Sequence, residues 1–139
     1  MQTVLIAEDS PRLRQRLDEE LRRVGYFTIL AQSAQEALGV LRSLRVDLLL
    51  ARERLTDVEG SMLARIARRR GLDELVVVLL ADDVRTVQKT LRGGVADAVL
   101  ARDLDVRALV RVVRRLLRPV VVRTSPPAVF AANCAFAKA

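Results

Sequence analysis

Short apolar runs alternate with longer amphipathic segments along most of the chain. Each apolar run is a few residues long and rich in Val, Ile and Leu, which is typical of strands. The longer segments repeat their apolar residues three or four positions apart, as Leu13, Leu17 and Leu21 do, which indicates helices with one buried face. Strands are predicted at 3–8, 26–31, 46–51, 74–81 and 96–101, and helices at 11–24, 33–44, 62–70, 84–91 and 106–117.

Capping residues mark the ends of the predicted helices. Ser10 followed by Pro11 is a helix start, and Gly25 is the matching stop. Ser33 with Glu36 forms a capping box at the second helix. Further boundaries are expected at Gly71, at Asp82 or Asp83, at Gly93-Gly94 and at Asp105, and the third helix carries Met62, Leu63, Ile66 and Ala67 on its apolar stripe.

Five strand-then-helix units joined by short links predict an α/β fold in which helices cover both faces of a parallel sheet. The unbroken apolar run 75–81 within the fourth predicted strand indicates a strand that is buried on both faces. We expect a flavodoxin-like (βα)5 three-layer sandwich with strand order 2-1-3-4-5.

The length of 139 residues fits one domain, expected at 1–118, followed by a tail or linker at 119–139 that contains a Pro-Pro pair and lacks a clear period. As an alternative, Val120–Val122 or the region of Phe130 and Phe136 packs against the body or a second copy. Aromatic residues are only 3% of the chain, so an aliphatic core is expected. The longest apolar run, 75–81, is too short to span a membrane, and the N-terminus lacks a basic leader. With one cysteine, Cys134, these features favour the cytoplasm.

The chain has no histidine, which excludes Ser-His and Cys-His nucleophilic pairs, histidine metal sites and phosphohistidine chemistry. Its formal net charge is +7, with 24 Lys and Arg residues against 17 Asp and Glu residues. The excess is almost entirely arginine, because lysine occurs only at Lys89 and Lys138. This balance favours acidic partners, nucleic acid among them.

Two carboxylates, Glu8 and Asp9, follow the first predicted strand. In open α/β sheets the functional crevice lies beyond the carboxyl ends of the strands, near the first and the third. An acidic pair there suits a hard cation such as Mg²⁺, which prefers oxygen ligands. The alternative is that one carboxylate caps the first helix and neutralises its dipole. The third strand delivers a cation, Arg52, to the same edge.

With this architecture the sequence resembles the receiver domain of bacterial two-component response regulators over nearly all of residues 3–117. The resemblance is carried by "TVLIAEDSPRLRQRL", "VDLLLARERLTDVEG", "VVVLLADD" and "LRGGVADAVLARDL". In that family an acidic pair after the first strand binds Mg²⁺, and an aspartate ending the third strand accepts a phosphoryl group from a histidine kinase. A Thr or Ser ending the fourth strand and a Lys ending the fifth contact the phosphate.

This chain keeps the acidic pair but departs from the family at the other positions. The count from Asp47 to Gly60 leaves no gap, and the Gly93-Gly94 stretch leaves an ambiguity of one residue near the fifth strand. The acceptor position is then Arg52, the hydroxyl position Leu80, the lysine position Ala101 or Arg102, and the position of the family's fifth-strand aromatic Ala98.

An arginine cannot accept a phosphoryl group, because the guanidinium stays protonated and has no basic lone pair. It also adds positive charge where Mg²⁺ would bind, so we expect no cofactor, weak or lost Mg²⁺ binding at Glu8 and Asp9, and no enzyme activity. We predict that Arg52 pairs with Glu8 or Asp9; the alternative is that it points into water. A displaced acceptor at Asp57, with Glu59 close by, is a further alternative, although transfer requires a nucleophile held close to the metal.

Basic residues also gather on the last two predicted helices and at the end of the third, "RIARRRG". In the family the fourth and fifth helices commonly carry dimer and effector contacts, so a protein partner or a homodimer is expected there. The resemblance implies an atypical receiver in a phosphorelay context that acts by protein–protein interaction. The alternative is a basic nucleic-acid-associated regulator, although no binding motif accompanies the charge. The candidate partner face is Arg85, Lys89, Arg92, Arg107, Arg111, Arg114 and Arg115.

Overall fold

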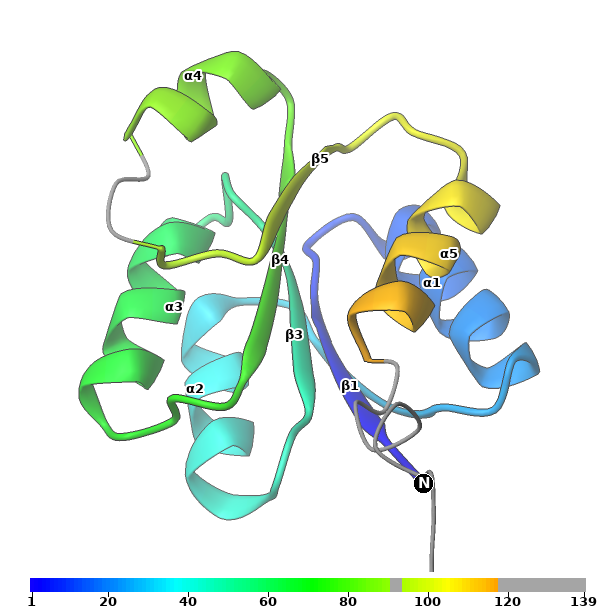
Figure 1. Cartoon of the computed structure of the whole chain (residues 1–139), viewed down its shortest axis with the longest axis horizontal. Helices are drawn as coiled ribbons and strands as arrows, with labels where there is room; N and C mark the ends of the chain where they lie inside the picture. Colours follow the sequence, from blue (N-terminus) through cyan, green and yellow to red (C-terminus); the bar gives the residue numbers. More distant parts are fainter. Residues whose placement is uncertain (91–93, 118–139) are drawn as a thin grey trace, which may run out of the picture.

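Five strands alternate with five helices in the computed structural model, which describes residues 1–90 and 94–117. The strands form one parallel sheet in the order β2-β1-β3-β4-β5, as predicted (Figure 1). The elements are β1 (Thr3–Ala7), α1 (Pro11–Arg23), β2 (Phe27–Ala31), α2 (Ala34–Ser43), β3 (Leu48–Arg52), α3 (Gly60–Arg69), β4 (Val76–Ala81), α4 (Val84–Thr90), β5 (Ala98–Ala101) and α5 (Val106–Leu116).

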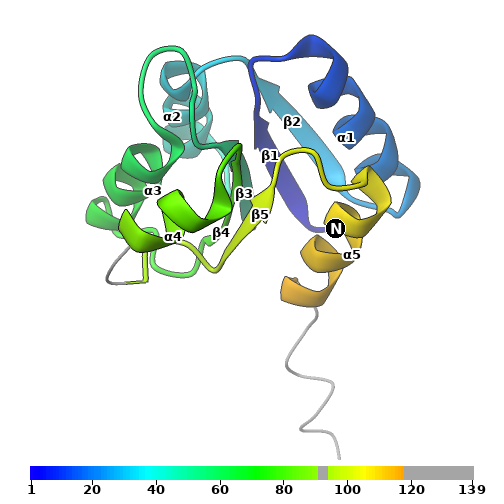
Figure 2. The same ribbon diagram turned by 90° about the horizontal axis from the view of Figure 1, so that it is seen from above.

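The helices form a layer on each face of the sheet. Helices α1 and α5 pack together on one face, while α2, α3 and α4 cover the other (Figures 1 and 2). This is the three-layer sandwich expected from the alternation of strands and helices, because each parallel crossover places a helix on one face of the sheet.

Successive residues of the central strands point to opposite faces and build two separate cores. Leu5, Leu49 and Leu79 pack beneath α2, α3 and α4. Their neighbours along the strands pack beneath α1 and α5, and Leu50 and Leu80 are two of them. All five side chains are at most 1% exposed, which explains why β1, β3 and β4 read as unbroken apolar runs. The edge strand β2 instead leaves two apolar side chains exposed, those of Phe27 and Leu30.

The predicted helix boundaries hold, with differences in detail. Gly25 and Gly71 follow their helices with positive φ angles of 104° and 90°, which glycine adopts at little cost. The Ser33 side chain accepts a hydrogen bond from the Glu36 N–H at 3.1 Å, but the Glu36 carboxylate accepts one from the Gln32 N–H rather than from that of Ser33. The reciprocal hydrogen bond of the capping box is therefore made to Gln32, one residue before the cap residue Ser33.

Of the two carboxylates considered for the start of α4, Asp83 is the cap. It accepts hydrogen bonds from the backbone and the hydroxyl of Thr86 at 3.3 and 2.8 Å. Ser10 and Asp105 occupy the cap positions of α1 and α5 but make no capping hydrogen bond through their side chains.

The apolar stripe predicted for α3 is partly wrong. Met62 is 38% exposed, and Ala64 is buried in its place. The buried face of α3 consists of small side chains and Leu63, because this helix lies close to the sheet.

Several predictions lie outside the described residues. Arg92, Gly93 and the segment 118–139, which includes the expected tail, belong to this group. Among the residues that the structure describes, no helix is long and apolar enough to cross a membrane.

Candidate functional site

The carboxyl ends of β1, β3, β4 and β5 meet at one edge of the sheet and bring five charged side chains together. The parallel register pairs Ala7 with Ala51 and Arg52 with Leu80, so the residues that follow these strands leave the sheet side by side. Glu8 and Asp9 follow β1, Arg52 ends β3, Asp82 follows β4, and Arg102 follows β5.

The guanidinium of Arg52 binds two carboxylates from neighbouring strand ends. Its Nη1 lies 2.7 Å from Oδ1 of Asp9, and its Nη2 lies 3.5 Å from Oδ2 of Asp82. The predicted pairing of Arg52 with the acidic pair is therefore confirmed for Asp9, and the alternative in which Arg52 points into water is wrong. The side chain of Arg52 is only 21% exposed, and its Nε is buried without a hydrogen-bond partner among the described residues.

Glu8, the other member of the acidic pair, binds a different arginine. Its carboxylate is 1% exposed and accepts two hydrogen bonds from Arg102, from Nε at 3.2 Å and from Nη2 at 3.1 Å. It also accepts the backbone N–H of Ser10 at 2.9 Å, just before α1. Of the two candidates for the lysine position, Arg102 thus has its side chain in the site, whereas Ala101 is the last residue of β5.

The ion pairs fix the charge state of the site. Burial opposes ionisation of Asp9, but the hydrogen bond and the charge of Arg52 outweigh it, so the pKa of Asp9 lies below its ordinary value. Burial likewise opposes the charge of Arg52, but Asp9, Glu8 and Asp82 together raise the pKa of its guanidinium. Both side chains therefore stay ionised across the physiological pH range.

The arrangement does not fit a magnesium ion. The carboxylates of Glu8 and Asp9 that would coordinate the metal already bind Arg102 and Arg52 at hydrogen-bond distance. A divalent cation beside two guanidinium groups would also meet strong electrostatic repulsion. Within residues 1–90 and 94–117, no cluster of three or more His, Cys, Asp or Glu side chains is arranged to hold a metal ion.

At the position where the related family has a hydroxyl side chain, the fourth strand has a leucine, Leu80. Leu80 is the register partner of Arg52 and is fully buried in the core beneath α1 and α5. It has no group that could donate a hydrogen bond to a phosphoryl oxygen.

The backbone of Arg52 is held in place by the turn before α3. A Cβ atom at Gly60 would lie 2.5 Å from the Arg52 carbonyl oxygen, so only glycine fits this approach. Glu53, next to Arg52, accepts hydrogen bonds from the N–H and the hydroxyl of Ser61, both at 2.8 Å. The turn glycine noted in the sequence therefore positions the arginine.

Two residues of the site escaped the sequence analysis. Asp82 was considered only as a helix cap, yet it is the second partner of Arg52. Arg14 donates from Nη1 to the backbone oxygen of Glu8 at 2.7 Å. The sequence carried no signal for the role of Asp82, because its approach to Arg52 depends on how β3 pairs with β4.

Asp57, the candidate displaced acceptor, is in the loop between β3 and α3, and its side chain contacts the start of α2. Its carboxylate accepts the backbone N–H groups of Ala34, Gln35 and Val58 at 3.0, 2.9 and 3.0 Å. Burial is the largest single influence and raises the pKa of this carboxyl, but the backbone hydrogen bonds together outweigh it and bring the pKa below its ordinary value. Both of its oxygens thus serve a structural role; the neighbouring Glu59 is the cap residue of α3 and is exposed.

The candidate partner face is exposed on two helices that flank the edge strand β5 from opposite faces of the sheet (Figure 2). None of its described side chains forms an ion pair with another described residue. These side chains are Arg85 and Lys89 on α4 and Arg107, Arg111, Arg114 and Arg115 on α5.

Comparison with known proteins places the sequence among signalling proteins. A sequence profile of the response regulator receiver domain matches residues 4–114. The transcriptional regulatory protein PcoR of Escherichia coli is 34% identical over 119 residues, which cover 85% of this chain and 52% of PcoR. The regulator of RpoS of Escherichia coli strain K12 is 31% identical over 117 residues, which cover 84% of this chain and 35% of that protein. The chain thus spans about half the length of the first relative and about a third of the second.

Solved structures share the fold. The crystal structure of response regulator protein TrrA from Thermotoga maritima, in complex with Mg²⁺-BeF, has a TM-score of 0.76 at 26% identity and is covered completely by 84% of this chain. The receiver domain of HemR from Leptospira biflexa has the same TM-score of 0.76 at 21% identity, with 86% of this chain and 96% of that chain covered.

Proposed function

The chain belongs to the family of response regulator receiver domains, and on that premise we propose that it is an atypical receiver that signals without phosphorylation at Arg52. In this proposal the domain acts by protein–protein interaction, and none of its residues is catalytic. The cofactor expected from the family, Mg²⁺, is weakly bound or lost.

The observation that supports this proposal most strongly is the contact of Arg52 with Asp9 at 2.7 Å. The side chain at the acceptor position is a permanent cation, and it binds the carboxylate that the family uses for the metal. A phosphoryl acceptor needs a nucleophilic oxygen, which a guanidinium lacks. In this proposal Arg52 therefore stabilises the strand ends electrostatically and does not take part in phosphoryl transfer.

The same contacts favour a fixed arrangement of the strand ends. Arg52 joins Asp9 after β1 to Asp82 before α4, and Arg102 joins β5 to Glu8. Such charge-assisted hydrogen bonds contribute roughly 1.5–3 kcal/mol each before the cost of desolvation. We infer that the domain holds one conformation and that its signal is controlled by binding, abundance or assembly.

A displaced acceptor at Asp57 is a weaker alternative. Its carboxylate accepts hydrogen bonds from three backbone N–H groups, those of Ala34 and Gln35 at the start of α2 and that of the adjacent Val58, so phosphorylation would break these hydrogen bonds. The lowered pKa keeps Asp57 ionised, but the contacts that lower it also hold the oxygens away from an incoming phosphorus.

Receiver domains interact with kinases and other protein partners, and the basic side chains of α4 and α5 are our candidate for that contact here. Exposed cations without an internal partner favour an acidic protein surface or a second copy with complementary charge. Nucleic acid remains the second candidate on charge alone. Binding to an arbitrary DNA duplex that weakens steeply with salt would favour it, and salt-insensitive or absent binding would count against it.

Intact-mass spectrometry after incubation with Mg²⁺ and acetyl phosphate tests the proposed function. We expect no phosphoryl adduct, whereas a receiver that retains its acceptor aspartate serves as the positive control. A hydroxylamine-sensitive adduct that disappears in an Asp57→Asn variant would support the displaced acceptor and overturn the proposal.

A further inference from the structure

A groove runs between the carboxyl-terminal ends of α2 and α3 toward the amino ends of β3 and β4. Its first part has a volume of about 290 Å³ and is lined by Leu38, Leu41, Arg42, Ala67, Arg70 and Leu72. Its second part, of about 480 Å³, shares Leu41 and Leu72 with the first, so the two parts are continuous. The groove lies at the opposite end of the sheet from Arg52.

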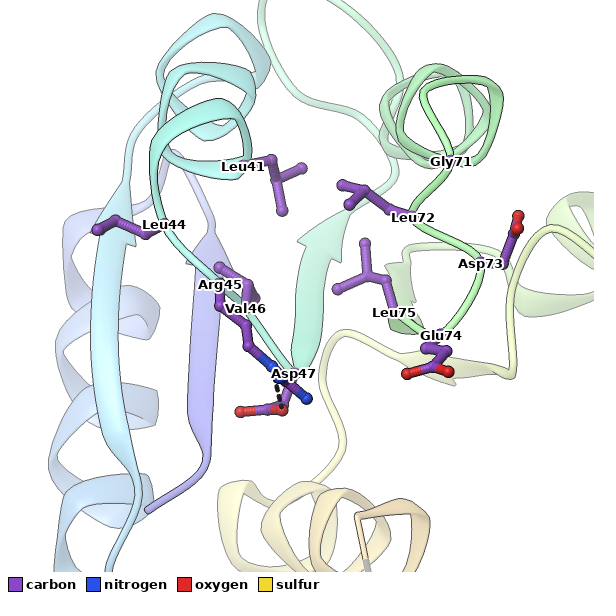
Figure 3. A pocket seen from close by; sticks show the side chains of 10 residues that line it. All are labelled: Leu41, Leu44, Arg45, Val46, Asp47, Gly71, Leu72, Asp73, Glu74 and Leu75. Atoms are coloured by element: carbon purple, nitrogen blue, oxygen red, sulfur yellow. Dashed lines mark ion pairs between the residues drawn. The ribbon is translucent and has the colours of Figure 1, made fainter.

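The floor of this α2–α3 groove is aliphatic. Figure 3 shows the side chains of Leu41, on α2, and of Leu72 and Leu75, on the loop between α3 and β4, converging across the second part. Leu44, at the end of α2, is 53% exposed beside them. Apolar surface that lines a groove between two helices is a common docking site for the side chains of a partner segment.

The two ends of the α2–α3 groove differ in charge, although the second part is also lined by Arg45, whose side chain is 88% exposed and lies 4.0 Å from Asp47. Arg42 and Arg70 are exposed at the first end, and neither side chain has a hydrogen bond or an ion pair within the described part of the chain. Asp73 and Glu74 are exposed at the other end, and their carboxylates also lack described partners (Figure 3). The groove therefore offers an aliphatic floor with free cations at one end and free anions at the other.

One wall of the groove is held rigidly by Arg68, which lies in the last turn of α3. Its Nη1 donates to the backbone oxygens of Leu72 and Asp73 at 3.1 and 3.2 Å, and to that of Leu75. Its Nη2 lies 3.4 Å from Oδ2 of Asp97. A preformed wall lowers the entropic cost of binding a partner.

We propose that the α2–α3 groove binds a short segment of a partner protein in which acidic residues lie next to a run of aliphatic ones. The aliphatic side chains cover the leucines, and the carboxylates pair with Arg42 and Arg70. A nucleic acid fits less well, because its phosphates have no use for an aliphatic floor and are repelled by Asp73 and Glu74. This surface is separate from the basic face of α4 and α5.

Amide chemical shifts of the full chain, titrated with synthetic peptides, test the proposal. The probe is a peptide in which a leucine-rich stretch follows a pair of glutamates, and the matched peptide has lysines in place of the glutamates. We expect the glutamate peptide to shift the amides of Leu41 and Leu72 saturably, and the lysine peptide to leave them unchanged. In the double variant Arg42→Glu/Arg70→Glu the affinity for the glutamate peptide should fall about tenfold or more, and the lysine peptide should now bind.

The matched protein control is Arg12→Glu/Arg16→Glu on α1, which makes the same charge change away from the groove and from the basic face of α4 and α5, and should leave both titrations unchanged. All four arginines are exposed, so the variants should keep the fold, which their circular dichroism checks. Equal binding of both peptides, binding that the α1 variant abolishes, or shifts of groove amides with a DNA duplex in place of the glutamate peptide would overturn the proposal.

Discussion

Arg102 and Glu8 form a two-point ion pair between the ends of β5 and β1, although 94 positions separate them in the sequence. The carboxylate of Glu8 is almost completely buried, so Arg102 supplies the cation that makes its burial tolerable. This pair and the neighbouring Arg52–Asp9 pair together fill the edge of the sheet where the family binds its metal and phosphate.

Replacing Arg102 with methionine should leave Glu8 buried without a cation. We expect the free energy of unfolding to fall by about 3 kcal/mol, measured by urea denaturation at neutral pH. Arg23→Met is the control, because its ion pair with Glu20 lies at the surface and should contribute little to stability. If the free energy of unfolding fell by the same small amount in both variants, the burial of Glu8 would not depend on its ion pair with Arg102.

Stability should also fall in acid because of Asp9 and Asp57. The pKa of each carboxyl lies below its ordinary value of 3.8 in the folded protein, so the unfolded chain binds more protons as the pH drops. The stabilisation is complete above 3.8 and is lost as the pH falls through the lowered pKa values. Urea denaturation between pH 7 and strongly acidic pH measures this loss.

The same acid titration has matched variants. Asp9→Asn and Asp57→Asn should each reduce the pH dependence, whereas Asp103→Asn should not, because the exposed Asp103 carboxylate has no described partner. A pH dependence that all three variants share with the original protein would contradict the assignment.

Gly60 and Gly39 offer a second matched pair. Gly60→Ala would push a methyl group against the Arg52 backbone, and we expect it to destabilise the fold by about 1–3 kcal/mol and to shift the amide resonance of Asp9. Gly39 lies within α2 with open space around its Cα, so Gly39→Ala should stabilise by roughly 1 kcal/mol. Thermal unfolding of both variants checks the prediction, and a harmless Gly60→Ala would show that Arg52 is not positioned by this turn.

The fold could be predicted because the signal that sets it is local. Apolar runs such as 75–81 and the caps at Gly25 and Ser33 encode elements within a few residues, and the short links leave few parallel topologies. The exposure of Met62 was missed because the stripe was assigned by residue type, whereas the close approach of α3 to the sheet selects alanine.

The candidate site was only partly predictable. The end of the third strand placed Arg52 beside the acidic pair, but which carboxylate it binds depends on side-chain direction, which alternates between Glu8 and Asp9. The choice between Ala101 and Arg102 rested on one uncertain position near Gly93 and needed the register of β5. The role of Asp82 could be seen only from the way β3 pairs with β4, which no local sequence pattern contains.

Magnesium titration calorimetry of the native chain and of Arg52→Asp tests the central claim most directly. If the guanidinium occupies the place of the metal, the native protein should show no saturable Mg²⁺ binding. Arg52→Asp should gain saturable binding, because the new carboxylate joins Asp9 and Glu8, and Arg54→Asp at an exposed neighbouring position should behave like the native protein. Saturable Mg²⁺ binding by the native protein as tight as that of Arg52→Asp would contradict the account.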